Sequence, residues 1–265
     1  MTQKESFLRC NLDFSSVFKD KNYLVTGATS GIGYEVTKEL LSLGANVTMT
    51  GRNAEKINKT TSSFANLKGK LYVIECDFSS AERTSELIKN SCIEQGPFHG
   101  CFHSAGIEMI KPVRMTKDSD VEKILSPTFY GAVGISKAFA SKGVAMEGAS
   151  IVFMSSIASL GGKSGLCLYS STRASIKGLV RSLACELSSR QIRVNSIMAG
   201  AIQTEMHARI LDGASKEVIN SYLNMHPLGF GDVSDVSNAA LFLLSKYSKW
   251  ITGTDLVVDG GYLCQ

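Results

Sequence analysis

The sequence lacks the cysteine patterns that mark disulfide frameworks and zinc sites. It contains no C-x-x-C pair, and its number of cysteines is odd. The four histidines show no ligand spacing with cysteine, so we expect no metal site. An unpaired set of this kind is typical of buried thiols in a reducing compartment. The cysteines are Cys10, Cys76, Cys92, Cys101, Cys167, Cys185 and Cys264.

Long apolar runs and concentrations of positive charge are also missing. No apolar stretch approaches the roughly 20 residues that span a bilayer. Residues 1–20 mix charged with apolar residues and form no signal core. The formal net charge of +4 is small for 265 residues, and no run of Lys or Arg stands out. We therefore expect a cytoplasmic protein with neither a membrane nor a nucleic-acid partner.

The sequence does contain a regular alternation of short apolar runs and longer periodic segments. The runs predict strands, and the segments between them predict helices, as from Ile32 to Leu43. This alternation predicts an α/β fold whose doubly wound, mostly parallel sheet lies between two helical layers. We find no internal linker or repeat, and expect one domain over 21–265 after an N-terminal extension, 1–20. The expected strands are 23–25, 47–49, 71–74, 99–102, 151–154, 194–197 and 256–258.

A glycine-rich turn follows the first expected strand and precedes a helical pattern. Its sequence is Thr26-Gly27-Ala28-Thr29-Ser30-Gly31-Ile32-Gly33. The first glycine allows a tight turn, the second lets the backbone approach a pyrophosphate, and the third lets the helix pack against the strand. The helix start offers free N–H groups and a positive dipole end to the anion. An ordinary glycine-rich turn is the alternative, but the strand–turn–helix context favours dinucleotide binding over both that alternative and a P-loop.

The residues after the second strand bear on the choice between NAD(H) and NADP(H). An acidic residue at this strand end would hydrogen-bond the ribose hydroxyls of NAD. Here the strand ends at Gly51, and Arg52 and Asn53 follow. The Arg52 guanidinium suits a 2′-phosphate in charge and in bidentate geometry. A solvated loop arginine would look the same in sequence, so we expect NADP(H) as the preferred cofactor and keep NAD(H) as the alternative.

Three polar residues have a spacing that suits acid–base chemistry. Tyr169 and Arg173 are four residues apart, on one face of an expected helix, and Ser156 lies just beyond the fifth expected strand. A phenol can donate or accept a proton at a substrate oxygen that a serine hydroxyl orients. Because a free tyrosine has a pKa of about 10, a nearby cation must favour the phenolate near neutrality. Spacing alone more often indicates a Tyr–Arg pair on a helix surface than a catalytic site.

Together with motifs elsewhere, these residues resemble the short-chain dehydrogenase/reductase family, in particular its single-domain members similar to 3-oxoacyl-ACP reductase. The matches follow the family's order over nearly the whole chain, up to residue 262. They are Thr26–Gly33, His103-Ser104-Ala105-Gly106, Ser156 with Tyr169, Arg193-Val194-Asn195, Ala199-Gly200 with Thr204, and Thr252-Gly253 through Asp259-Gly260-Gly261.

The resemblance implies a Rossmann-type fold and hydride transfer between a nicotinamide and a carbonyl or secondary alcohol. It implies that Tyr169 is the general acid/base and that Ser156 holds the substrate oxygen. Members of the family are often homotetramers, so the resemblance implies a homo-oligomer. We expect the apolar stripe of the Tyr169 helix to form part of its interface. The implied cofactor contacts are Asp77 at the adenine, Ser104-Ala105-Gly106 at the adenine ribose, Thr204 at the nicotinamide carboxamide, and in addition Phe78, Tyr169, Arg173, Gly200 and Ile202.

Two departures from the family pattern touch the chemistry. Arg173 replaces the family's lysine, which lowers the tyrosine pKa and binds the nicotinamide ribose. Arginine keeps the charge but is planar, larger and never deprotonated, which closes a proton wire through this residue. Thr128 stands where the family has an asparagine that holds a relay water, and Pro127 beside it should kink or end the helix. The milder departures are Ser104 for an asparagine and Ala199 for a proline.

Two functional hypotheses stay open. In the first, the chain is a working reductase with a modified tetrad of Thr128, Ser156, Tyr169 and Arg173. In the second, it is a cofactor-binding pseudo-enzyme that acts as a sensor or as a partner subunit. Retention of the serine and the tyrosine favours catalysis on a small-molecule carbonyl or alcohol. His103 we expect to be a buried histidine with satisfied hydrogen bonds, because the tyrosine already fills the acid/base role.

Overall fold

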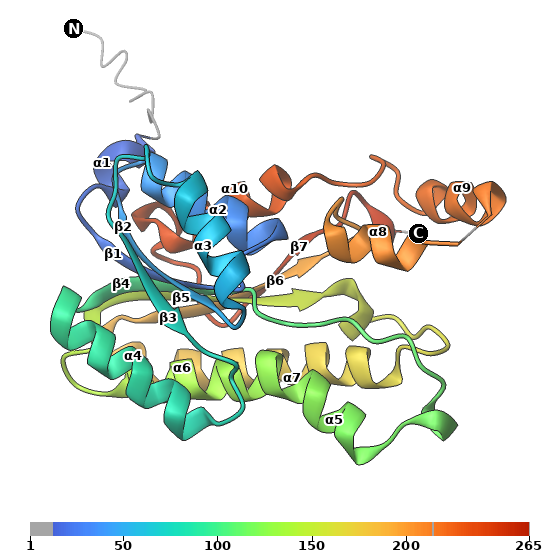
Figure 1. The fold of residues 1–265 in the computed structure, drawn as a ribbon, viewed down its shortest axis with the longest axis horizontal. Helices are drawn as coiled ribbons and strands as arrows, with labels where there is room; N and C mark the ends of the chain where they lie inside the picture. The colour runs from blue at the N-terminus through green and yellow to red at the C-terminus, as the bar shows by residue number, and fades with distance from the viewer. Residues whose placement is uncertain (1–12, 214, 265) are drawn as a thin grey trace, which may run out of the picture.

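Seven strands form one parallel sheet in the computed structural model, which describes residues 13–213 and 215–264 (Figure 1). The strand order is β3-β2-β1-β4-β5-β6-β7, and each neighbouring pair is parallel. The order reverses between β1 and β4, which is the switch point where doubly wound folds bind ligands. All the predicted strands are confirmed. Their bounds are β1 Asn22–Thr26, β2 Asn46–Gly51, β3 Leu71–Glu75, β4 Phe98–His103, β5 Ala145–Ser156, β6 Arg193–Ala199 and β7 Asp255–Val258.

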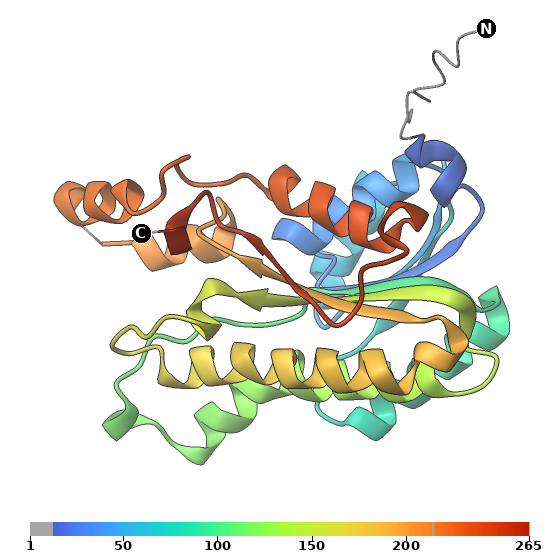
Figure 2. The ribbon, with the colours of Figure 1, turned by 180° about the vertical axis from the view of Figure 1, so that it is seen from behind.

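Helices cover both faces of the sheet, as Figures 1 and 2 show from opposite sides. One face carries α1 (Phe14–Phe18), α2 (Gly31–Ser42), α3 (Ala54–Ser63) and α10 (Val233–Leu244). The other carries α4 (Ala81–Gln95), α5 (Asp118–Leu125), α6 (Gly131–Ala140) and α7 (Cys167–Glu186). After β6, α8 (Glu205–Leu211) and α9 (Lys216–Asn224) lie beyond the sheet at one end of the molecule. Short 3-10 turns occupy Val113–Met115, Ile157–Ser159, Ser188–Arg190, Lys246–Ser248 and Tyr262–Cys264. The predicted three-layer fold is confirmed.

Strand residues alternate between two separate hydrophobic cores. In β1, Tyr23 and Val25 belong to the core beneath α2 and α10, whereas Leu24 belongs to the core beneath α4, α6 and α7. In β5, Val152 joins the first core and Phe153 the second. Successive side chains of a strand point to opposite faces, and both faces are covered. This is why the strands are continuous apolar runs rather than alternating patterns.

Part of the expected N-terminal extension is packed into the first core. The Asp13 carboxylate accepts a hydrogen bond from the Ser16 amide and caps α1. Val17 and Phe18 in that helix are buried. Because this helix contributes core side chains, the packed part of the chain begins before residue 21, where the domain was expected to begin. Residues 1–12 lie outside the described residues.

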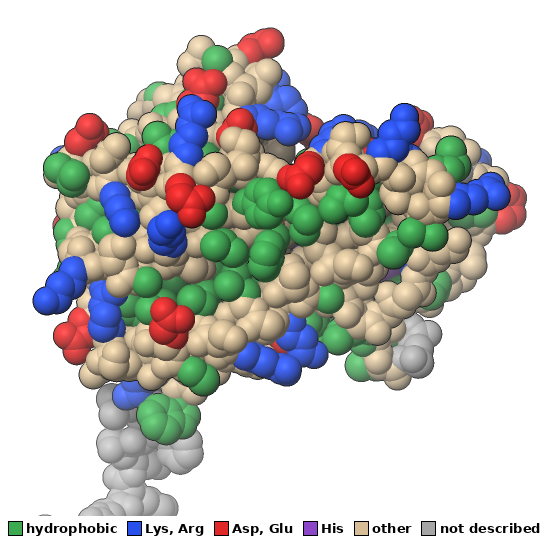
Figure 3. All heavy atoms as spheres, turned by 90° about the horizontal axis from the view of Figure 1, so that it is seen from below, with side chains coloured by type: hydrophobic (Ala, Val, Ile, Leu, Met, Phe, Trp, Pro, Cys, Tyr) green, Lys and Arg blue, Asp and Glu red, His purple; other side chains and the backbone are tan. Residues whose placement is uncertain are grey.

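The apolar stripe of α7 faces the sheet and not a partner. Ile176, Val180 and Leu183 are buried in the second core. The predicted interface role of this stripe is therefore wrong, because the chain's own sheet covers it. Figure 3 shows the outer surface of this helical layer, where hydrophobic side chains gather near the middle and charged side chains lie around them. The exposed positions of α7 include the small residues Ser171, Ala174 and Gly178.

The cysteines are divided between core and surface. Among the described ones, Cys76, Cys92 and Cys101 are buried, and Cys167, Cys185 and Cys264 are exposed. The expectation of buried thiols therefore holds for half of them, and Cys10 lies outside the described residues. Within 13–213 and 215–264, no helix combines the length and apolar character that a membrane crossing requires.

Candidate active site

The carboxyl ends of the strands bring most of the predicted site residues to one edge of the sheet. The glycine-rich turn follows β1, Arg52 follows β2, and Asp77 follows β3 after one residue. The turn at 104–106 follows β4, Ser156 ends β5, and Gly200 follows β6. In open parallel sheets, ligands bind in the crevice outside this edge. The fold therefore assembles residues that are far apart in the sequence.

Gly27 and Gly33 of the first turn are required by close backbone packing, and Gly31 by its φ of +56°. Gly27 has φ +66°, and a Cβ there would lie 2.9 Å from the Ala105 amide nitrogen. A Cβ on Gly33 would lie 2.4 Å from the Gly27 carbonyl oxygen. A Cβ on Gly31 would contact the Thr204 side chain at 3.4 Å. The turn thus packs at once against the helix that follows it, the turn after β4 and the start of α8.

The N-terminus of α2 is left open to an anion. Its N-cap residue Ser30 makes no side-chain hydrogen bond to the first turn. By contrast, Asn53, Ser80 and Thr204 each cap the helix they precede. Uncapped N–H groups at the positive end of a helix dipole favour phosphate binding. The cradle formed by the glycines and these amides fits the pyrophosphate of a dinucleotide.

The adenosine end of such a ligand would meet a small cavity at the ends of β2 and β3. Its volume is about 350 Å³, and Arg52 and Asp77 are among its lining residues. The Asn53 Oδ1 accepts a hydrogen bond from the Lys56 amide at 2.8 Å and so caps α3. The Phe78 ring is buried beside His103. Because the ring is buried, only the backbone of Phe78, which has φ +60°, borders this edge of the sheet.

His103 joins three segments of the site through hydrogen bonds. Its Nε2 lies 2.9 Å from the Thr128 carbonyl oxygen, and its Nδ1 lies 2.7 Å from Thr26 Oγ1. Because a carbonyl can only accept, Nε2 carries the hydrogen and Nδ1 accepts from the Thr26 hydroxyl. That hydroxyl accepts in turn from the Ala105 amide at 3.2 Å. The ring is fully partnered in its neutral form, which confirms the expectation of a satisfied buried histidine.

Burial also keeps the His103 ring neutral. Desolvation, with a smaller contribution from the positive charge of Arg173, lowers the pKa of this imidazole to about 4, although hydrogen bonds to the backbone of Thr128 and Pro127 oppose the shift. An imidazole with this pKa stays uncharged over the physiological range. It therefore holds a strand and two turns together without a charge.

Ser156 and Tyr169 come from neighbouring elements. Ser156 Oγ accepts a hydrogen bond from the Ala158 amide at 3.2 Å, which leaves its O–H free to donate to a ligand oxygen. Tyr169 stands in the first turn of α7, a helix that packs on β5 and β6. Its ring is partly exposed. The phenol is therefore carried by a helix whose other face is fixed in the core.

Arg173 points into the protein. Its side chain is 5% exposed, and Nη1 donates to the Met154 carbonyl oxygen at 3.0 Å. The guanidinium carbon lies 5.2 Å from the centre of the Tyr169 ring. A Cβ on Gly106 would lie 2.5 Å from Arg173 Nη2, so the absent side chain makes room for the guanidinium. The arginine thus stays beside the tyrosine while bound to β5.

The helix next to this pair is interrupted at Pro127, as predicted, but it does not end there. α5 passes into α6 through a π-helical turn, Ser126–Tyr130. Proline lacks the N–H that an α-helix needs at this point, and single π turns are common at functional sites. Thr128 is buried in the turn, and its Oγ1 has no hydrogen-bond partner among the residues that the structure describes; the same is true of Arg173 Nε. Thr128 Oγ1 would lie 3.0 Å from a Cβ on Gly106, and a ligand oxygen beside this turn would satisfy it.

The far side of the crevice carries residues that the sequence did not single out. Tyr222 of α9 packs against His207 of α8 and against Phe230. Burial raises the pKa of Tyr222, and the charges of Tyr262, Tyr169 and Glu108 add to the shift. These interactions place α9 opposite the predicted catalytic tyrosine. Sequence spacing held no signal for them, because they come from separate loops and helices.

Glu108 contributes a carboxylate on this side of the crevice. Among the described residues its buried Oε2 has no hydrogen-bond partner. Burial raises the pKa of Glu108, and the positive charge of Arg209 opposes that shift. The cluster of Tyr222 and Tyr262 is capped by Lys163, whose Nζ lies 4.5 Å from the first ring and 5.2 Å from the second. Aromatic walls with a few polar groups are typical of a small-molecule site.

Two further predicted cofactor residues shape the floor after β6. A Cβ on Gly200 would lie 2.8 Å from the Asp259 Cα, and Ile202 is buried and bridges to Gly231.

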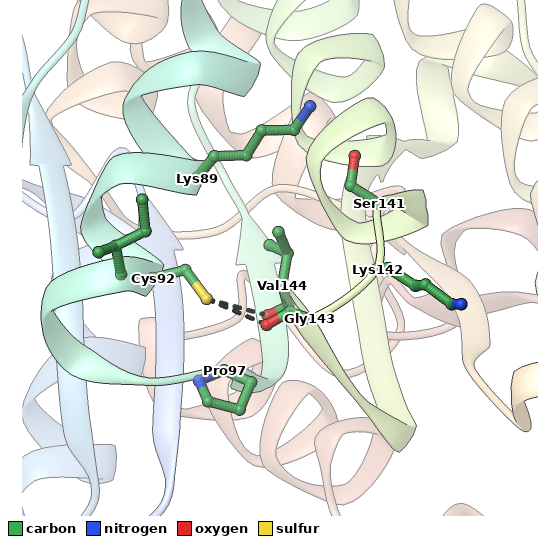
Figure 4. Close-up of a pocket in the computed structure, with 8 residues that line it drawn as sticks. Lys89, Cys92, Pro97, Ser141, Lys142, Gly143 and Val144 are labelled. Carbon is green, nitrogen blue, oxygen red and sulfur yellow. Dashed lines mark hydrogen bonds between the residues drawn. The ribbon is translucent and has the colours of Figure 1, made fainter.

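A larger cavity of about 510 Å³ lies away from the site, where α4 and α6 end (Figure 4). There Cys92 Sγ points at the Gly143 and Val144 carbonyls. It contains none of the predicted site residues.

The fold and the glycine-rich turn define an α/β protein of the dinucleotide-binding class. In comparison with protein families, residues 27–263 match the family described as enoyl-(acyl carrier protein) reductase. The chain belongs to the short-chain dehydrogenase/reductase family, whose members bind nicotinamide cofactors, and it is an oxidoreductase of that family.

Individual relatives extend over nearly the whole chain. Carbonyl reductase family member 4 of Danio rerio is 34% identical over 90% of this chain and 96% of its own length. The 3-oxoacyl-(acyl-carrier-protein) reductase FabG of Aquifex aeolicus is 31% identical over 90% and 95%. A short-chain type dehydrogenase/reductase from Mycobacterium ulcerans has a solved structure with a TM-score of 0.87 and 32% identity, covering 94% and 92%. A blue fluorescent protein from a metagenomic library, solved in complex with NADPH, reaches 0.84 at 25% identity, covering 92% and 98%.

Proposed function

We propose that this protein is an NADP(H)-dependent oxidoreductase that interconverts a carbonyl and a secondary alcohol, with Tyr169 as general acid/base. The observation that carries the proposal is the meeting of the open α2 N-terminus, Ser156 and Tyr169 at one edge of the sheet. The bound nicotinamide supplies or accepts the hydride. The free O–H of Ser156 orients the substrate oxygen, and the Tyr169 hydroxyl exchanges a proton with it.

Cofactor preference and substrate class are the finer parts of this proposal. Arg52 in the cavity at β2 supports NADP(H), and one structural relative was solved in complex with NADPH. Relatives named as carbonyl and 3-oxoacyl reductases support a ketone substrate. The matched family's description adds an enoyl thioester as a substrate to test. Homo-oligomerisation and a cytoplasmic location stay predictions.

The test is NADPH oxidation by the purified protein over a panel of small ketones, keto-sugars, β-ketoacyl thioesters and an enoyl thioester. Tyr169→Phe should abolish most turnover, because the phenol is the proposed proton donor; general acid–base groups contribute about 10²–10⁴-fold. Tyr72→Phe on edge strand β3 serves as the matched control and should keep full activity. Turnover by Tyr169→Phe equal to that of the natural protein would remove the tyrosine from its proposed role.

The inward orientation of Arg173 supports a second candidate, a cofactor-binding protein with weakened catalysis. Its guanidinium donates to the Met154 carbonyl, and Thr128 Oγ1 has no hydrogen-bond partner in the described part of the chain. A Thr128→Asn, Arg173→Lys double variant restores the family's residue types at both positions. Turnover by the natural protein supports the enzyme, whereas turnover by the double variant alone supports the second candidate.

A further inference from the structure

A second arginine borders the cavity at the carboxyl ends of β2 and β3. The cavity is lined by Arg52, Glu75, Cys76, Asp77 and Arg83. Arg52 directly follows β2, whereas Arg83 is the third residue of α4, so the two side chains come from different elements. The cavity adjoins the phosphate-binding turn, since a Cβ on Gly51 would lie 3.0 Å from the Thr29 methyl group.

Neither guanidinium has a protein partner within the described part of the chain. The ion pairs within 4.0 Å there join Lys38 to Glu35, Lys111 to Asp120 and Lys137 to Glu82. Both arginines are exposed at the rim, and neither side chain donates a hydrogen bond there. A guanidinium presents donors in a fixed fork that matches a phosphate. The cavity therefore offers two such forks that no group within 13–213 and 215–264 occupies.

The acidic lining residues do not occupy these donors. Asp77 Oδ1 accepts from the Ser79 amide at 3.0 Å and from the Ser79 hydroxyl at 2.8 Å. These bonds lower the pKa of Asp77, and the charge of Arg83 lowers it further. Glu75 is exposed at the end of an edge strand. Because the lining holds two carboxylates and two guanidiniums, recognition of an anion depends on directed donors and not on net charge.

We propose that Arg83 is a cofactor-specificity residue that, together with Arg52, brackets the 2′-phosphate of NADP(H). The inference rests on the proposed preference for NADP(H) and extends it to a second side chain. A phosphate offers three strong acceptor oxygens, enough for two guanidiniums approaching from β2 and from α4. The 2′-hydroxyl of NAD(H) is neutral and has a single oxygen, so it cannot form a charge-assisted bidentate contact with either guanidinium. Arg83 therefore contributes to discrimination and not to binding of the shared adenosine.

The experiment measures the dissociation constants of NADP+ and NAD+ by calorimetry, so that it does not depend on turnover or on a known substrate. Arg83→Gln should weaken NADP+ by about ten-fold or more and leave NAD+ within about two-fold. Arg52→Gln should act in the same direction. Arg181→Gln, an exposed arginine of α7, is the matched control and should change neither constant. The unfolding temperatures should stay equal, because all three arginines are exposed.

Each other outcome overturns the assignment and shows where it fails. Equal weakening of NADP+ and NAD+ by Arg83→Gln would mean that Arg83 contacts the shared adenosine part. Loss of NADP+ affinity in Arg52→Gln but not in Arg83→Gln would remove Arg83 and keep the proposed cofactor preference. If the natural protein binds NADP+ no more tightly than NAD+, the preference itself fails, and the role of Arg83 fails with it.

Discussion

Arg173 shows how one residue can keep a charge and still change a site. Its guanidinium lies over the Tyr169 ring, fills the space beside Gly106 and donates to the Met154 carbonyl. These contacts use the length and the fork of arginine, which a lysine does not have. At this position, therefore, the side chain supports the packing between α7 and β5 as well as the charge beside the tyrosine.

This double role predicts a loss of stability when the guanidinium is removed. Arg173→Met should lower the free energy of unfolding by about 1–3 kcal/mol, because the buried Met154 carbonyl loses its donor. Arg181→Met on the exposed face of the same helix is the control and should stay within about 0.5 kcal/mol of the natural protein. Urea denaturation measures both. Equal stability of the two variants would show that the Met154 contact contributes nothing.

At the scale of elements, the junction of β1 and α2 depends on backbone contact. The Gly33 position has no room for a Cβ, because backbone atoms of Gly27 lie 2.4 and 2.7 Å from where it would stand. Gly178 is its counterpart in α7, exposed and with nothing within 4 Å of an added Cβ. The same substitution should therefore have opposite effects at the two sites.

Gly33→Ala should destabilise the protein by about 1–3 kcal/mol, because the strand and helix must separate to admit the methyl group. It should also weaken dinucleotide binding, since the amides of the turn move with the helix. Gly178→Ala should stabilise the protein by about 0.5–1 kcal/mol through helix propensity. Denaturation and calorimetry with NADP+ follow both effects. If Gly33→Ala left the affinity for NADP+ unchanged, the position of the turn would not determine cofactor binding.

The sequence predicted the features that depend on neighbouring residues, and it did not predict those that depend on contacts between distant elements. Each strand is a short apolar run, and the glycine turn is contiguous, so both could be predicted from a few neighbouring residues. The burial of Phe18 and the cavity side chain of Arg83 depend on elements distant in the chain, and neither was predicted. The stripe of α7 was recognised as apolar, but its sequence alone does not say whether a sheet or a partner covers it.

At the scale of the whole molecule, His103 couples the site to overall stability. The ring connects β1, the turn after β4 and the π turn before α6, and it is buried between them in the neutral form. The pKa of the imidazole is about 4 in the folded protein, against an ordinary value of 6.5. Between these two values the unfolded chain binds a proton that the folded protein does not. Stability from this group is therefore complete above pH 6.5 and falls as the pH is lowered towards 4.

His103→Asn removes this titration while leaving a polar side chain that can accept from Thr26. At pH 7 the variant should be less stable than the natural protein, because the shorter side chain loses the bond to the Thr128 carbonyl. As the pH falls from 6.5 to 4, the gap should narrow by as much as roughly 3 kcal/mol, at about 1.36 kcal/mol per pKa unit. Carboxylates and the other histidines titrate in both proteins and cancel in the difference. Chemical denaturation of both proteins at several pH values measures that difference. If their unfolding free energies changed in parallel from pH 7 to pH 4, His103 would not stay neutral in the folded protein.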